Sequence, residues 1–148
     1  MSTQTFIVEE LQKNDYFNGH LQLLSQLTIT NPENITFEQF CDTYDKQIQQ
    51  GKKIFVVRDN KDKIIATASL IIEQKFTRDL SKAGHIEDVV TDREHRKKGL
   101  GKLLVDYCKN YASQQGCYKT LLNCSDDNAP FYEKCLFEKK DVGMACYF

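Results

Sequence analysis

The chain has 148 residues with a formal net charge of -1; 41% of them are hydrophobic and 28% are charged. This length suits one core, so we expect a single domain over residues 1–148. Without net positive charge, neither nucleic acid nor a membrane surface is expected as a partner. No stretch reaches the roughly 18 apolar residues that cross a bilayer. Residues 1–10 lack the order of a signal peptide, so we expect a cytoplasmic protein.

Six cysteines and three histidines are the residues on which a metal site would draw. No two cysteines have the C-x-x-C spacing typical of zinc sites, so no metal is expected. We interpret the cysteines as reduced thiols that act as small, buried hydrophobic residues.

The N-terminal part of the chain predicts one strand and two helices. Residues 6–10 read as a strand, and residues 17–27 have apolar positions at helical spacing. Asn and Pro at residues 31–34 break the chain, after which Thr36 is expected to cap a second helix. The apolar stripe of that helix consists of Phe37, Phe40, Cys41, Tyr44 and Ile48.

Two β-rich runs, residues 53–58 and 64–73, predict a hairpin because the polar residues between them favour a turn. A charged loop is expected at residues 74–83, followed by a strand at residues 84–91.

The clearest predicted element is the helix after that strand. Its unbroken apolar face consists of Leu100, Leu103, Leu104, Tyr107, Cys108, Tyr111 and Ala112. Strands are expected at residues 120–124 and 142–148, with a last helix at Tyr132. This order predicts an α/β fold with a mixed sheet flanked by helices, and with parallel pairing near the middle of the sheet.

Residues 96–101, with the sequence RKKGLG, form a glycine-rich turn before that helix. Such a turn offers free backbone N–H groups and a positive dipole end to an anion, and glycines let the ligand approach the backbone. Arg96 stands where a P-loop needs glycine, and Leu104 stands where a dinucleotide fingerprint needs one. The pattern R-x-x-G-x-G after a strand resembles instead the coenzyme A pyrophosphate loop of the GNAT (Gcn5-related N-acetyltransferase) superfamily.

Four segments together resemble glucosamine 6-phosphate N-acetyltransferases: GHIEDVV at residues 84–90, GKLL at 101–104, GCYK at 116–119 and FYEKC at 131–135. The similarity extends from about Lys75 to Met144, and the N-terminal half matches mostly in pattern. The resemblance implies the GNAT fold and transfer of acetyl from acetyl-CoA to the 2-amino group of glucosamine 6-phosphate. The product, N-acetylglucosamine 6-phosphate, leads to UDP-N-acetylglucosamine. A homodimer is also implied.

The resemblance implies site residues as well. For coenzyme binding they are Val89, Val90, Thr91, Arg96, Lys97, Lys98, Gly99, Leu100, Gly101, Asn128, Tyr132, Glu133 and Lys134. For the sugar phosphate they are Thr28, Lys75, Phe76, Thr77, Arg78, Glu87, Asp88, Val89, Tyr118, Lys119 and Asn123. Catalysis is implied for Tyr132, Glu87 and Asn123.

The implied reaction needs an acid for the leaving thiolate and a base for the amine. Tyr132 suits the first role because a phenol with a pKa of about 10 can protonate or hydrogen-bond a thiolate. Only one of Phe131 and Tyr132 can easily face the core, and we expect Tyr132 to face outward. Glu87 and Asp88 are neighbours on a strand and are expected to point to opposite faces, with Glu87 orienting or deprotonating the amine.

Positive charge gathers at Lys75, Arg78 and Lys82, which suits a phosphate, while Lys97 and Lys98 are candidates for the 3′-phosphate of the coenzyme.

The sequence departs from the family pattern at two positions. Asn123 stands where an acid is expected, so the base is Glu87 or a bridging water. Tyr147 stands where an arginine normally reaches across the dimer to the phosphate.

Three alternatives remain open at this point. The first is a GNAT enzyme for another small amine, although Lys75 and Arg78 would repel a polycation. The second is a nucleic-acid-binding module led by residues 93–98, which the acidic balance and the lack of interleaved aromatic residues oppose. The third is a regulatory domain that binds acetyl-CoA without chemistry.

Overall fold

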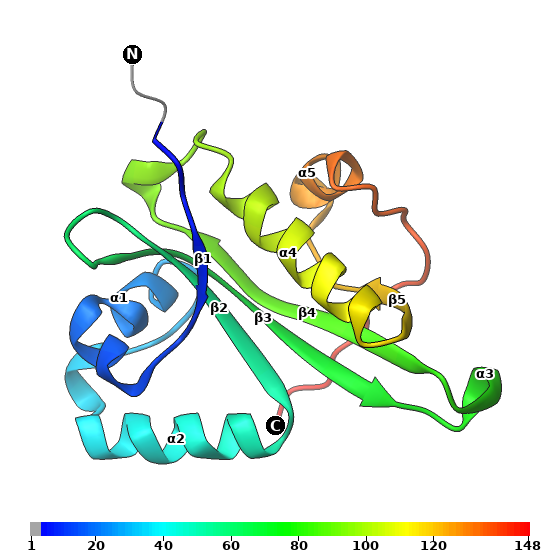
Figure 1. The fold of residues 1–148 in the computed structure, drawn as a ribbon, viewed down its shortest axis with the longest axis horizontal. Coiled ribbons are helices and arrows are strands. Elements are labelled where there is room, and N and C mark those ends of the chain that lie inside the picture. The colour runs from blue at the N-terminus through cyan, green and yellow to red at the C-terminus, as the bar shows by residue number, and fades with distance from the viewer. Residues whose placement is uncertain (1–3) are drawn as a thin grey trace.

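The computed structural model describes residues 4–148, and within them the strands form one five-stranded sheet in the order β1-β2-β3-β4-β5 (Figure 1). The strands are β1 (Val8–Glu10), β2 (Lys52–Arg58), β3 (Ile64–Gln74), β4 (Lys82–Thr91) and β5 (Cys117–Leu121). Neighbouring strands from β1 to β4 are antiparallel, whereas β5 is parallel to β4. The mixed sheet confirms the predicted fold class. The parallel pair lies at one edge of the sheet, and not near its middle, because the helical crossover leads to the outermost strand.

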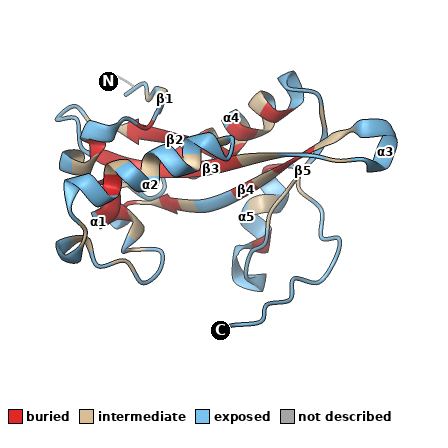
Figure 2. Cartoon of the chain, turned by 90° about the horizontal axis from the view of Figure 1, so that it is seen from below, coloured by how far each residue is buried: buried red, intermediate tan, exposed pale blue. Residues whose placement is uncertain are grey.

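Helices cover both faces of the sheet (Figure 2). The α-helices are α1 (His20–Leu24), α2 (Phe37–Gln49), α4 (Leu100–Gln114) and α5 (Ala129–Lys134), with a short turn α3 (Thr77–Leu80). The 3-10 helices are η1 (Lys13–Asn18), η2 (Pro32–Asn34), η3 (Arg93–His95) and η4 (Asp126–Asn128).

Strand β2 divides the core into two layers because successive side chains of a strand point to opposite faces. Phe55 and Val57 pack in the layer that contains the apolar face of α4. Ile54 and Val56 pack in the layer formed with α1 and α2. All four side chains are buried, so the sheet is fixed between its two helical coverings.

Several predicted boundaries shift in the structure. Gly19, with φ 86°, divides the predicted helix at residues 17–27 into η1 and α1. Thr36 caps α2 as predicted, since its Oγ1 accepts a hydrogen bond from the backbone N–H of Gln39 at 3.1 Å. Strand β5 begins earlier than the predicted residue 120, because Gly116 (φ 86°) turns the chain directly after α4.

The final strand predicted at residues 142–148 is wrong for this chain. Residues 142–148 have no regular structure and lead away from the sheet (Figure 2). Val142, Met144 and Tyr147 are 86%, 94% and 92% exposed. An apolar pattern forms a strand only beside a second backbone, and within residues 4–148 none pairs with this segment.

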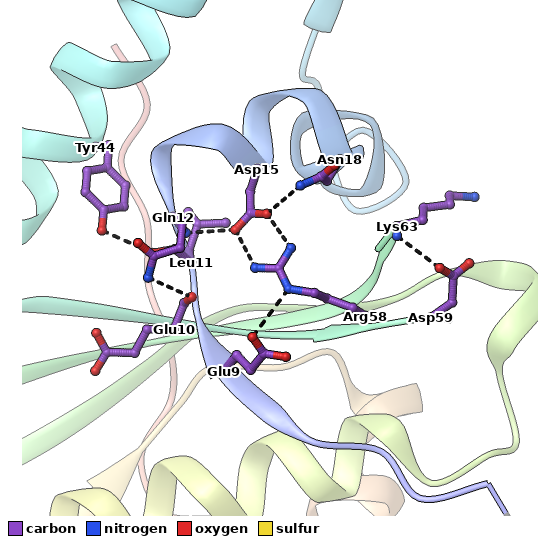
Figure 3. Close-up of polar contacts among 10 residues, drawn as sticks. All are labelled: Glu9, Glu10, Leu11, Gln12, Asp15, Asn18, Tyr44, Arg58, Asp59 and Lys63. Atoms are coloured by element: carbon purple, nitrogen blue, oxygen red, sulfur yellow. Dashed lines mark hydrogen bonds and ion pairs between the residues drawn. The ribbon is translucent and has the colours of Figure 1, made fainter. Parts of the chain in front are cut away.

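A buried ion pair between Asp15 and Arg58 connects η1 to strand β2 of the sheet (Figure 3). Asp15 of η1 is 1% exposed, and its carboxylate accepts hydrogen bonds from the Arg58 guanidinium, including Nη2 to Oδ2 at 2.8 Å. Asn18 and the backbone N–H of Gln12 donate to the same carboxylate. Burial alone would raise the pKa of Asp15, but the hydrogen bonds from Arg58, Asn18 and Gln12 outweigh it and lower the pKa.

Candidate functional site

The turn between β4 and α4 leaves the first turn of α4 open. Lys97 and Gly99 have left-handed backbone angles, φ 65° and 76°. Gly99 is the N-cap of α4, and among residues 4–148 no side-chain cap bonds this helix end. A Cβ on Gly99 would meet nothing within 4 Å, so glycine is favoured here by its φ and not by crowding. The open N–H groups and the exposed cations Arg96, Lys97 and Lys98 together suit an anion.

Gly101, two residues after Gly99, is required by side-chain packing as well. A Cβ on Gly101 would lie 3.1 Å from Cζ of Phe131, so the glycine leaves room for an aromatic ring of α5. From the sequence, this glycine is expected to let a ligand approach the backbone, and the structure adds a contact that joins α5 to the start of α4.

Strand β4 contains a bulge beside the predicted catalytic carboxylate. Between Glu87 and Val90, β4 has one more residue than the paired segment of β3, and Asp88 has φ 51°. The prediction that Glu87 and Asp88 alternate between faces is therefore wrong, because a left-handed residue interrupts the pleat. Both carboxylates are exposed, and Oδ2 of Asp88 lies 3.7 Å from Nζ of Lys52. A bulge leaves backbone groups of β4 free of the ladder and available to a ligand.

Tyr132 of α5 is half-buried at the edge of the core, where its ring packs edge-on against Phe131 (4.9 Å) and Phe137 (6.1 Å). The expected orientation is reversed: Phe131 is the more exposed ring at 37%, because it covers the start of α4. Burial, followed by the nearby thiols Cys124 and Cys135, raises the pKa of Tyr132 to about 12. This phenol is protonated at neutral pH. Because a thiol has a pKa of about 8.5, hydrogen bonding to a thiolate is favoured over full proton transfer.

The predicted phosphate loop has a left-handed turn at its tip. Arg78, Asp79 and Leu80 in α3 have φ of 52°, 57° and 63°. Phe76 is 92% exposed, and Thr77 is also exposed. Left-handed angles at non-glycine residues cost on the order of 1 kcal/mol each, so this conformation needs support from contacts outside the turn.

Arg78 supplies such a contact by stacking on Tyr118. Its guanidinium carbon lies 4.7 Å from the centroid of that ring, and Nζ of Lys119 lies 5.5 Å from the same centroid. Two exposed cations from separate segments thus meet on one aromatic ring of β5. This Arg78–Tyr118–Lys119 group brings together three of the predicted sugar-phosphate residues.

The other two cations predicted to gather in this loop have partners elsewhere, which corrects the predicted grouping. Nζ of Lys75 lies 3.1 Å from Oε1 of Glu73, and Nε2 of His85 lies 2.9 Å from the same oxygen. The hydrogen bonds from His85 and then Lys75 lower the pKa of Glu73. Lys82 donates to the backbone carbonyl of Gln115 at 3.2 Å.

The remaining predicted residues are exposed, but they do not all lie beside these groups, because Thr28 follows α1, which is at the opposite end of the sheet from α3 (Figure 1). Asn123 follows β5, and its Oδ1 lies 3.2 Å from the position that a Cβ on Gly143 would occupy, so the C-terminal segment passes beside it. The other exposed members of the predicted set are Thr28, Asn128, Glu133 and Lys134.

Known proteins are similar to this chain in both sequence and fold. The profile described as "Acetyltransferase (GNAT) family" matches residues 14–137. Glucosamine 6-phosphate N-acetyltransferase of Arabidopsis thaliana is 39% identical over 98% of both chains. Glucosamine 6-phosphate N-acetyltransferase 1 of Dictyostelium discoideum is 41% identical over 93% of this chain and 87% of its own. This chain belongs to the GNAT acetyltransferase family. The crystal structure of the Arabidopsis enzyme superimposes with a TM-score of 0.92 over 98% of this chain and 99% of that chain, at 40% identity.

One buried group of this acetyltransferase was not found from the sequence. Asp92, at the start of the predicted pyrophosphate loop, is 4% exposed and contacts Gln26, His95 and Lys63. Its only sequence signal is an aspartate directly after a strand, which also suits an ordinary surface cap.

Within residues 4–148, no helix is both long and apolar enough to cross a bilayer. Over the same residues, no three His, Cys, Asp or Glu side chains are grouped as metal ligands.

Proposed function

We propose that this protein transfers the acetyl group of acetyl-CoA to the 2-amino group of glucosamine 6-phosphate. The products are coenzyme A and N-acetylglucosamine 6-phosphate, which feeds the synthesis of UDP-N-acetylglucosamine. Membership of the GNAT family supports acetyl-CoA as co-substrate. The observation that carries the proposal is the match, over nearly the whole chain, to relatives named for this sugar phosphate.

The coenzyme side uses the open end of α4. Backbone N–H groups near Gly99 and the cations Arg96 to Lys98 would hold the pyrophosphate and the 3′-phosphate. The bulged strand at Val89 to Thr91 would pair with pantetheine as a further strand does. Asn128, and Tyr132 to Lys134, would lie beside the sulfur. When bound, acetyl-CoA supplies a thioester whose acyl carbon the amine attacks.

Each of the three proposed catalytic side chains has one role in the reaction. Glu87, an exposed carboxylate, orients the amine and takes its proton directly or through water. Asn123 cannot accept a proton, so its amide orients the amine. Tyr132 donates a hydrogen bond to the leaving thiolate, in keeping with its raised pKa. A backbone N–H freed by the β4 bulge offers a donor where charge develops on the acyl oxygen.

The phosphate of the sugar is bound mainly by the Arg78–Tyr118–Lys119 group, next to the residues near Lys75. Thr28 would contact the sugar substrate from the turn after α1, at the other end of β4. Stacking holds the guanidinium plane of Arg78 in one orientation, which suits bidentate contact with phosphate oxygens. We also infer a cytoplasmic location. We further infer a homodimer, because the terminal residues 142–148 are too apolar to remain uncovered.

Free thiol released from acetyl-CoA tests this proposal. Equal concentrations of glucosamine 6-phosphate, glucosamine and spermidine are compared as acceptors. We expect the highest kcat/KM with glucosamine 6-phosphate. A higher kcat/KM with either other amine would replace this function by acetylation of a different small amine.

A further inference from the structure

Three separate segments of the chain meet at the carboxylate of Asp92. Its Oδ1 accepts a hydrogen bond from Nε2 of Gln26 at 3.0 Å. Its Oδ2 lies 3.0 Å from Nδ1 of His95 and 3.6 Å from Nζ of Lys63. Burial alone would raise the pKa of Asp92, but the bonds from Gln26 and His95 and the charge of Lys63 lower it to about 2. The carboxylate is therefore charged at neutral pH and is held by the turn after α1, the β2–β3 turn and η3.

Gln26 uses both ends of its amide at this junction. While Nε2 donates to Asp92, Oε1 accepts a hydrogen bond from the backbone N–H of Arg93 at 3.0 Å. Arg93 is the first residue of η3, which leads into the pyrophosphate loop. One side chain thus fixes both the carboxylate and the backbone at the base of that loop.

The same glutamine belongs to the segment that carries a sugar-phosphate residue. Thr28 is two residues further along, and its backbone N–H donates to the carbonyl of Leu24 at 3.2 Å. The N–H of Leu27 donates to that same carbonyl at 2.9 Å. These bonds make residues 24–28 one compact turn, so a displacement at Gln26 is transmitted to Thr28.

We infer that Gln26 and Asp92 are positioning residues that couple the coenzyme site to the sugar-phosphate site, so that each ligand strengthens binding of the other. The inference rests on the proposed function. A pyrophosphate that orders the loop after Arg93 also orders Gln26, and through it the turn that presents Thr28. Linkage requires the effect to be reciprocal, so the sugar phosphate tightens binding of the coenzyme by the same factor.

A single-atom change separates this role from general packing. Gln26→Glu keeps the size of the side chain and the oxygen that accepts from Arg93, but it places a second carboxylate against Asp92. Because Asp92 remains charged at neutral pH, the two groups repel each other and the junction opens. Gln22→Glu, on the exposed side of α1, makes the same charge change away from the junction and is the matched control.

A second substitution restores the hydrogen bond between residues 26 and 92 with donor and acceptor exchanged. In the double variant Gln26→Glu with Asp92→Asn, the new amide donates to the new carboxylate. The Arg93 N–H keeps its acceptor. Recovery in this variant shows that the contact itself, and not either residue alone, carries the effect.

Calorimetry with free coenzyme A and glucosamine 6-phosphate measures the coupling, since these two ligands cannot react. In the unsubstituted protein and in Gln22→Glu, saturating coenzyme A should lower the Kd of the sugar phosphate by about fivefold or more. In Gln26→Glu this factor should fall to about one, and the Kd of coenzyme A alone should rise about tenfold. The double variant should regain most of the coupling and most of the affinity for coenzyme A.

Three results would overturn the inference: no coupling in the unsubstituted protein, unchanged coupling in Gln26→Glu, or a double variant that regains the melting temperature without the coupling. Failure of the proposed function is distinguishable from these. It would appear as no binding of glucosamine 6-phosphate by any variant. The Kd of coenzyme A alone would still show whether Gln26 positions the loop.

Discussion

Removing the side chain of Arg78 tests how the phosphate is recognised. Arg78→Ala removes a guanidinium that lies 4.7 Å from the ring centroid of Tyr118. At an exposed site this stacking contributes about 0.5–1 kcal/mol, which helps to hold the guanidinium of Arg78 in one orientation. The stack is present in the free protein, so the lost affinity comes mainly from the hydrogen bond to the charged phosphate, about 1.5–3 kcal/mol. Each 1.4 kcal/mol corresponds to about a tenfold change in affinity. We therefore expect KM for glucosamine 6-phosphate to rise about tenfold to a hundredfold.

The assay is steady-state thiol release with the phosphorylated and the unphosphorylated sugar as acceptors. KM for acetyl-CoA should barely change, and the preference for the phosphorylated sugar should narrow. Arg78→Lys should give an intermediate KM, because it keeps the charge but loses the planar stacking. Lys46→Ala, which removes an exposed cation from α2, is the matched control and should behave like the unsubstituted protein.

An Arg78→Ala variant that keeps the full preference for the phosphorylated sugar would refute this reasoning. The Arg78–Tyr118–Lys119 group would then be a structural contact of the α3 turn, and the phosphate would be read elsewhere.

Three further predictions follow from other parts of the chain. Tyr132→Phe should lower kcat while leaving the Kd of acetyl-CoA nearly unchanged, since the proposed task of the phenol is to bond the leaving thiolate. An unchanged kcat, with chemistry shown to be rate-limiting, would remove Tyr132 from the mechanism. Burial lowers the pKa of His20 from 6.5 to about 4, so the unfolded chain binds the proton first as pH falls. Relative to His20→Phe, the free energy of unfolding should therefore decrease by about 1.4 kcal/mol per pH unit across that window in urea titrations, and parallel pH profiles would contradict this. Light scattering at tens of micromolar should show a homodimer, and deletion of residues 142–148 should weaken it; a monomeric unsubstituted chain would exclude the assembly.

Local patterns were enough to predict the elements around the proposed coenzyme site. The apolar period of α4 and the Thr36 cap are properties of neighbouring residues, and both predictions were confirmed. The glycine-rich turn was also predicted from neighbouring residues, and the left-handed φ of Gly99 is a reason for glycine that only the structure shows.

Features that depend on distant partners could not be predicted from local patterns. The bulge at Asp88 is defined by register with β3, and the stack of Arg78 on Tyr118 joins residues forty positions apart. The pattern at residues 142–148 predicts a strand that would need a neighbouring backbone, and no strand of residues 4–148 pairs with this segment. Asp92 contacts side chains from three segments, and no local sequence pattern predicts that these contacts bury it.

The identity of the acetylated product tests the central claim most directly. The protein is given acetyl-CoA with equal amounts of glucosamine 6-phosphate and glucosamine, and the products are identified by mass spectrometry and by NMR of the acetylated nitrogen. We predict N-acetylglucosamine 6-phosphate as the dominant product, with the acetyl group on the 2-amino nitrogen and the phosphate retained. Preferential acetylation of unphosphorylated glucosamine, or no acetylation of either sugar, would contradict the account.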